Sequence, residues 1–187
     1  MAKTNTINSD TWANQPSIIN MLVTMVVGVA GLGYLMIAMT TQDMLWFVPW
    51  FTAQPSAIHL NCYGVQTTID PASADGQALI AAFNAQMSSG QKRWDQTSLS
   101  DDSLAYFETS DAMVMLEFNY SPAVRVHGAF IYFQAADRML VSLDGRHATL
   151  NPVFGRNNGQ MIPGALSLPT TDPLKDVLRD SGLCAVR

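Results

Sequence analysis

The chain has 187 residues, with ten Lys and Arg against fifteen Asp and Glu, which gives a formal net charge of −5 at pH 7. A nucleic-acid module needs a concentrated basic face, yet adjacent basic residues occur only at Lys92-Arg93. Nucleic acid is therefore excluded as an expected partner.

Residues 18–39, IINMLVTMVVGVAGLGYLMIAM, form an uncharged apolar run interrupted by Asn20 and Thr24. At ~1.5 Å per residue, about 20 helical residues cross the ~30 Å hydrocarbon core of a bilayer. The preceding polar segment, residues 1–17, carries one Lys and one Asp, and the run is longer than the apolar region of a cleaved signal peptide. We predict a single-pass transmembrane helix over 18–39. The alternative is a buried helix of a soluble protein, which seldom lacks a polar face.

One face of this helix is predicted to be lined mostly by small residues. Spacings of four and three relate Thr24, Gly28, Gly31, Leu35 and Ala38. Such stripes let helix backbones approach closely in lipid, where packing drives association. We expect the stripe to dock against another membrane helix. The alternative is that glycine is simply common in transmembrane helices.

Aromatic residues flank the apolar run on both sides. They are Trp12 before it and Trp46, Phe47, Trp50 and Phe51 after it. Amphipathic rings prefer the headgroup region, so residues 40–56 are interpreted as an interfacial segment and linker that contacts the lipid bilayer. An aromatic platform for a ligand is the alternative.

Orientation rests on Lys3, because no other basic residue occurs before Lys92. The positive-inside rule then favours a cytoplasmic N-terminus and an extracytoplasmic C-terminal domain in the cell (inner or cytoplasmic) membrane. Cys62 and Cys184 lie at opposite ends of that domain. They either form a disulfide, which an oxidising compartment permits, or remain buried thiols.

Residues 57–187 are predicted to form one α+β domain with an antiparallel β-meander and helices on one face. A strand over 57–69 precedes a helix that opens at Asp70-Pro71 and ends at Ser88-Ser89-Gly90. A polar stretch, 91–103, then leads into further strands. They are expected at 104–109, 112–120, 123–133, 138–143 and 146–150, the last two joined at Asp144-Gly145, and a final helix opens at Asp172-Pro173 and closes at Gly182.

The remaining segment, 151–171, is predicted to be a long Gly/Pro-rich loop. Loops of this length tend to be functional or to lie against another surface. We expect it to contact a partner protein through Phe154, Arg156, Asn157, Met161 and Ile162. The alternative is an Ω-loop that packs on its own core.

Chemistry-bearing motifs are scarce. The sequence has no GxGxxG, Walker loop, GxSxG, HExxH or CxxC. His59, His127 and His147 fall on separate predicted strands, so they are interpreted as structural side chains. No catalytic residue, cofactor or metal is predicted.

Two weaker metal patterns were weighed against ordinary packing. Met113 and Met115 share a strand face and offer thioethers that suit Cu(I), but they also fit a buried strand. Four acidic residues form a second pattern, a cluster of Asp101, Asp102, Glu108 and Asp111. This acidic cluster lacks the spacing of a calcium-binding loop and fits a solvated surface better.

These features favour a non-catalytic accessory or structural subunit of a larger membrane complex, with other membrane subunits as partners. A respiratory or photosynthetic electron-transfer assembly is the first specific expectation. The alternative is a membrane-tethered extracytoplasmic binding module or metallochaperone using Met113, Met115 and one His. An exported, anchored enzyme is the third hypothesis.

Overall fold

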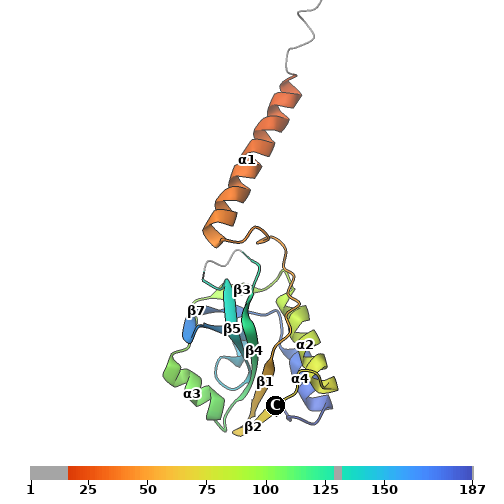
Figure 1. Ribbon diagram of the computed structural model, residues 1–187, viewed down its shortest axis with the longest axis vertical. Helices are drawn as coiled ribbons and strands as arrows, with labels where there is room; N and C mark the ends of the chain where they lie inside the picture. Colours follow the sequence, from red (N-terminus) through yellow and green to blue (C-terminus); the bar gives the residue numbers. More distant parts are fainter. Residues whose placement is uncertain (1–16, 129–131, 187) are drawn as a thin grey trace, which may run out of the picture.

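The computed structural model describes residues 17–128 and 132–186, and they form an apolar helix followed by an α+β domain (Figure 1). Helix α1 (Ile18–Thr41) begins at Ser17, whose Oγ accepts a hydrogen bond from the Ile19 N–H at 3.3 Å. It ends at Gln42, which adopts a left-handed conformation with φ 52°. The helix is thus two residues longer than predicted. Within the described residues it is the one helix long and apolar enough to span a membrane, and its residues are almost all exposed.

The domain is built on one seven-stranded sheet in which all pairings are antiparallel. The strand order is β2-β1-β4-β5-β6-β7-β3. The strands are β1 (Ala57–Cys62), β2 (Val65–Ile69), β3 (Arg93–Asp95), β4 (Val114–Arg125), β5 (Ala135–Asp144), β6 (Pro152–Asn157) and β7 (Gln160–Ser167). The predicted α+β class with an antiparallel sheet is confirmed.

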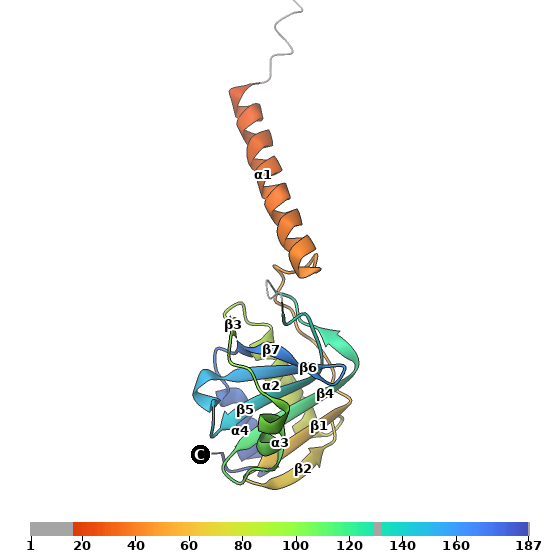
Figure 2. The same ribbon diagram turned by 90° about the vertical axis from the view of Figure 1, so that its left-hand side faces the viewer.

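Helices cover both faces of this sheet, whereas the sequence led us to expect them on one (Figures 1 and 2). Helices α2 (Ala74–Met87) and α4 (Asp172–Asp180) lie side by side on one face, and α3 (Asp101–Thr109) lies on the other. Each face of the sheet has its own hydrophobic core, because successive side chains along β4 point to opposite faces. Leu116 and Phe118 belong to the larger core, while Met113 and Met115 belong to the smaller core under α3.

Segment 104–109, predicted as a strand, is helical in the structure. Ser100 caps α3, its Oγ accepting a hydrogen bond from the Ser103 N–H at 3.2 Å, and two acidic residues occupy the first turn. Leu104 and Phe107, three residues apart, supply the buried face. The correct signal was therefore a cap followed by helical spacing.

Segment 151–171, predicted as a loop, contains a β-hairpin. Strands β6 and β7 are joined at Asn158 and Gly159, whose φ angles are 50° and 79°. Asn-Gly is the strongest two-residue hairpin signal, so the loop prediction for 151–171 is wrong. Phe154 and Ile162 are buried in the domain's own cores, so a surface role for these two residues is wrong.

Three smaller corrections concern turns and strand ends. Residues 57–69 form the β1–β2 hairpin, which turns at Tyr63 and Gly64, instead of one strand. Residues 146–150 form no strand, because a short 3-10 turn at Ala148–Leu150 follows Asp144-Gly145. The strands expected at 112–120 and 123–133 form one strand, β4, as far as Arg125, while residues 129–131 lie outside the described part.

A disulfide joins Cys62 at the end of β1 to Cys184, which follows α4, with the two Cα atoms 5.8 Å apart. The bond therefore ties the C-terminal segment to the end of β1, the second strand from one edge of the sheet. The closed loop spans 122 residues, for which the chain-entropy account predicts about 4–5 kcal/mol of stabilisation. The alternative of two buried thiols does not hold.

Candidate functional site: the junction between helix and domain

The last two turns of α1 pack against the chain segment that follows the helix. Tyr34, Ile37, Ala38 and Thr41 lie on one face because they are spaced by three, one and three residues. Ala38 and Thr41 are buried, and Tyr34 and Ile37 are half-buried, whereas every residue from 18 to 33 is exposed. The C-terminal end of α1 therefore has its own packing surface within this chain.

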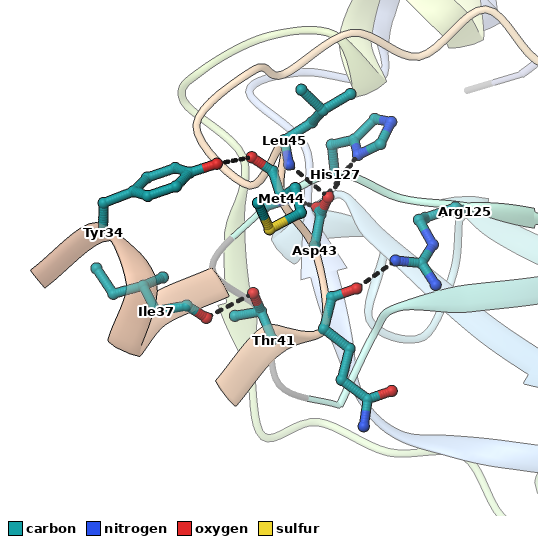
Figure 3. Close-up of polar contacts among 10 residues, drawn as sticks. Tyr34, Ile37, Thr41, Asp43, Met44, Leu45, Arg125 and His127 are labelled. Atoms are coloured by element: carbon teal, nitrogen blue, oxygen red, sulfur yellow. Dashed lines mark hydrogen bonds and ion pairs between the residues drawn. The ribbon is translucent and has the colours of Figure 1, made fainter. Parts of the chain in front are cut away.

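Segment 42–47 covers that surface. The Tyr34 hydroxyl donates a hydrogen bond to the Met44 carbonyl at 2.7 Å (Figure 3). The rings of Tyr34 and Phe47 meet edge to face with centroids 6.1 Å apart. The Thr41 hydroxyl donates to the Ile37 carbonyl at 2.8 Å, so this polar group is satisfied inside the helix. The chain thus folds back on α1 immediately after it ends.

Asp43 connects this segment to the end of β4. Asp43 is only 5% exposed, and its carboxylate accepts hydrogen bonds from the Leu45 N–H at 2.9 Å and the Gly128 N–H at 3.4 Å. His127 Nδ1 lies 3.1 Å from both carboxylate oxygens. An ionised carboxylate only accepts, so Nδ1 carries the proton in this contact. Figure 3 shows His127 and the carboxylate pointing toward each other.

A second contact runs from Arg125, whose guanidinium donates to the Gln42 carbonyl at the end of α1 (Figure 3). This contact satisfies a carbonyl just past the helix C-terminus and places a positive charge where the helix dipole is negative. Two side chains from the end of β4 therefore hold two consecutive residues of the junction.

The junction also sets the charge state of Asp43. Burial alone would raise the pKa of this carboxyl, but the hydrogen bonds from Leu45 N–H and His127, together with the attraction of the imidazole, outweigh it. The net pKa of Asp43 lies below its ordinary value of 3.8. The carboxylate is therefore ionised at neutral pH, in the form that the surrounding donors require.

The aromatic residues after α1 divide into two groups. Phe47 and Trp50 are 58% and 74% exposed, and Trp46 is partly buried, and the place of these three at a membrane interface stays a prediction. Phe51 is only 4% exposed and packs against the rings of Phe83 and Tyr120 in the main core. Its predicted interfacial role is wrong. Trp12 lies outside the described residues.

The small-residue stripe of α1 is open over most of its length. Thr24, Gly28, Gly31 and Leu35 are exposed, and a Cβ added at either glycine would meet no heavy atom within 4 Å. Ala38 differs, because it is buried in the junction of its own chain. The stripe available to a partner helix therefore ends before Ala38, and docking at the other four residues stays a prediction.

A polar cleft of about 490 Å³ lies between α3 and the β2-β1-β4-β5 part of the sheet. Arg138 joins its two acids, with Nε 3.1 Å from Glu117 and Nη1 3.4 Å from Glu108. His59, opposite Glu117 in the β1–β4 register, instead contacts the Thr68 hydroxyl at 3.1 Å. No local pattern in the sequence indicates this cleft, since only strand pairing brings these residues together.

The structure does not assemble the weaker metal patterns. Met113 and Met115 are buried in the core under α3, so packing accounts for both. His59 lines the cleft, His127 is in the junction, and His147 lies against Phe107 and Phe154. Among the described residues, no group of three or more His, Cys, Asp or Glu side chains is placed to hold a metal ion.

The acidic cluster is also dispersed into separate contacts. Asp101 lies 3.6 Å from Arg156, and Glu108 pairs with Arg138. Arg156, Asn157 and Met161 are half-buried on the β6–β7 hairpin, and their contact with a partner stays a prediction.

No known protein family has a model that matches this chain, and no curated protein or solved structure matches it.

Proposed function

We propose that this protein is a single-pass, non-catalytic accessory subunit of a larger membrane complex. Its helix packs against other membrane helices, and its domain is held in a fixed place beside the membrane surface. The proposed orientation has a cytoplasmic N-terminus and an extracytoplasmic domain. The Cys62–Cys184 disulfide supports that side, because disulfides persist in oxidising compartments.

The observation that carries the proposal is the tied junction. A simple membrane tether works with a flexible linker, which lets a domain reach and turn. Here Asp43 is held by His127 and two backbone N–H groups, Gln42 by Arg125, and Met44 by Tyr34. A fixed helix-to-domain geometry is useful when helix and domain must both meet the same assembly at once.

The stripe supports the same conclusion from within the membrane. Gly28 and Gly31 have open space around them, and glycine inside a helix costs about 0.5–1 kcal/mol relative to Ala. A neighbouring helix that approaches these glycines closely offsets that cost through backbone packing.

The test is co-migration in native gels after mild detergent extraction, with mass spectrometry of the associated chains. Respiratory and photosynthetic complexes are the first assemblies to look for. The double variant Gly28→Leu/Gly31→Leu is expected to migrate alone with an intact domain. Gly33→Leu, on a different face of α1, is the matched control and should keep the wild-type position. Wild-type protein that migrates only as a free monomer contradicts the proposal.

A second candidate, a membrane-tethered binding module, is favoured by one observation, the polar cleft at Arg138, Glu117 and Glu108. Its copper-carrying version loses support, because Met113 and Met115 are buried. Ligand binding to the cleft that is lost in Arg138→Met, without change in complex assembly, would favour this candidate over the first.

A further inference from the structure

A buried lysine lies beside a cavity at the β3–β7 edge of the sheet. Lys92 immediately precedes β3 and is only 8% exposed. No hydrogen bond or ion pair of its side chain is found among the described residues, whose ion pairs all involve other cations. Burial lowers the pKa of this ammonium. The Lys92 stem is buried, but its Nζ is not among the described polar atoms that are enclosed without a partner, so the ammonium reaches open space beside it.

The cavity that Lys92 lines has a volume of about 660 Å³ and is built from three chain segments. These are residues 90–93, 149–151 and 167–169. Hydrogen bonds fix the last two segments, since the Ser167 hydroxyl donates to the Leu150 carbonyl at 2.6 Å and the Leu168 N–H to the Asn151 carbonyl at 2.9 Å. Pairing of Arg93 with Ser167 joins the first segment to them. The walls are therefore held by the fold.

The lining is cationic in a chain that is acidic as a whole. Lys92 and Arg93 are its two charged residues, no Asp or Glu is among the described residues that line it, and Gln91 and Thr149 add uncharged donors. Arg93 also attracts the carboxylate of the nearby Asp95, which leaves Lys92 as the unmatched charge. A point-charge ammonium next to a planar guanidinium suits a multiply charged oxyanion.

We propose that this cavity binds a phosphate group, with the Lys92 ammonium as its charge partner in the wall and Arg93 at the rim. The volume leaves room for more than the phosphate itself, so the group belongs to a phosphorylated small molecule or to a phospholipid headgroup. The site is independent of the proposed role of α1, because none of its residues lies in the helix or the junction.

The first experiment needs no substitution. The full chain in nanodiscs is reductively methylated with ¹³C-formaldehyde, which labels Lys92, Lys175 and Lys3 together with the N-terminus and preserves their charges. Inorganic phosphate is titrated into phosphatidylcholine nanodiscs, with chloride at equal ionic strength as reference. In a second arm, the buffer contains no inorganic phosphate and the nanodiscs contain phosphatidylglycerol.

The Lys92 dimethylamine signal is expected to shift saturably with phosphate or in phosphatidylglycerol, while the Lys175 signal on α4 stays in place. A response to phosphate alone identifies a soluble phosphorylated ligand, and a response to phosphatidylglycerol identifies a headgroup. A shift no larger than that caused by chloride in the first arm, with none in the second, overturns the proposal.

Substitution gives an independent readout. Lys92→Met keeps the apolar stem and removes the charge, so it should raise the thermal midpoint in phosphate-free buffer and weaken phosphate binding about tenfold or more. Lys175→Met is the matched control and should leave binding unchanged. Phosphate that stabilises Lys92→Met as much as wild type contradicts the assignment.

Discussion

Two parts of α1, residues 18–33 and residues 34–41, are both mostly apolar in sequence but differ in what surrounds them. Residues 18–33 are all exposed, and no other described residue of this chain covers them. Residues 34–41 bury one face against segment 42–47, which the end of β4 holds in turn (Figure 3). Hydrophobicity therefore identifies the helix, while the surrounding chain decides which part of it packs within this protein.

Removing the Asp43 carboxylate should have the largest effect on the packing of residues 34–41 against the rest of the chain. Asp43→Ala leaves His127, Leu45 N–H and Gly128 N–H without their acceptor, which is expected to cost about 1–3 kcal/mol of junction stability. Spin labels at the exposed positions Met36→Cys and Ala81→Cys, the latter on α2, report the helix-to-domain distance. We expect the distance distribution to broaden markedly. Asp180→Ala, at an exposed site on α4, is the control, and equal widths in both variants would contradict a tied junction.

Overfilling the buried end of α1 tests the same difference through packing. Ala38→Leu should destabilise the junction by about 1–3 kcal/mol, because the extra methyl groups have no space beside segment 42–47. Ala30→Leu adds the same atoms to the exposed part, residues 18–33, and should leave the label distances unchanged. If both substitutions change the label distances equally, the two parts of α1 do not differ in their packing.

Acidification should reproduce part of the Asp43→Ala effect. Because the pKa of Asp43 in the folded protein is below 3.8, its contribution is fully present above pH 3.8 and is lost as the pH falls through that lowered value. The label distances should therefore stay constant from pH 7 to 5 and broaden only in strong acid. Asp43→Asn lacks the titrating group and should show no such transition at the junction. If the label distances of the wild-type protein instead change between pH 5 and 7, a group other than Asp43 controls the pH response of the junction.

The smallest expected effect comes from one hydroxyl. Tyr34→Phe keeps the ring against Phe47 and removes the hydrogen bond to the Met44 carbonyl, at a cost of about 0.5–1.5 kcal/mol. Hydrogen exchange at the amides of residues 44–47 should become moderately faster. Tyr106→Phe, an exposed tyrosine on α3, is the control and should leave these rates unchanged.

Local patterns predicted the fold where one signal acted alone. The apolar run of α1 and the Asp172-Pro173 start of α4 are both found within two residues of their predicted bounds. Where two local patterns compete in one segment, the more obvious pattern predicts the wrong element. Leu104–Thr109 suggested a strand until Ser100 is recognised as a cap, and Gly and Pro obscured the Asn158-Gly159 turn.

The junction is harder to predict, because its parts are distant in sequence. Asp43 and His127 are 84 residues apart, and neither lies in a motif. Phe51 looks like its interfacial neighbours Phe47 and Trp50, yet it inserts between Phe83 and Tyr120. The basic pair Lys92-Arg93 is the opposite case, since a charged residue is expected at the surface. Lys92 is buried, whereas Arg93 is exposed.

The sequence by itself determined the apolar helix, the antiparallel α+β class and a cysteine pair at opposite ends of the domain, because these depend on composition and short-range periodicity. Only the tertiary structure decided that the cysteines meet, that α1 is tied to β4 and that Lys92 faces a cationic cavity. Each of these depends on which distant segments share a surface, and strand order and helix placement set that through burial of the whole core.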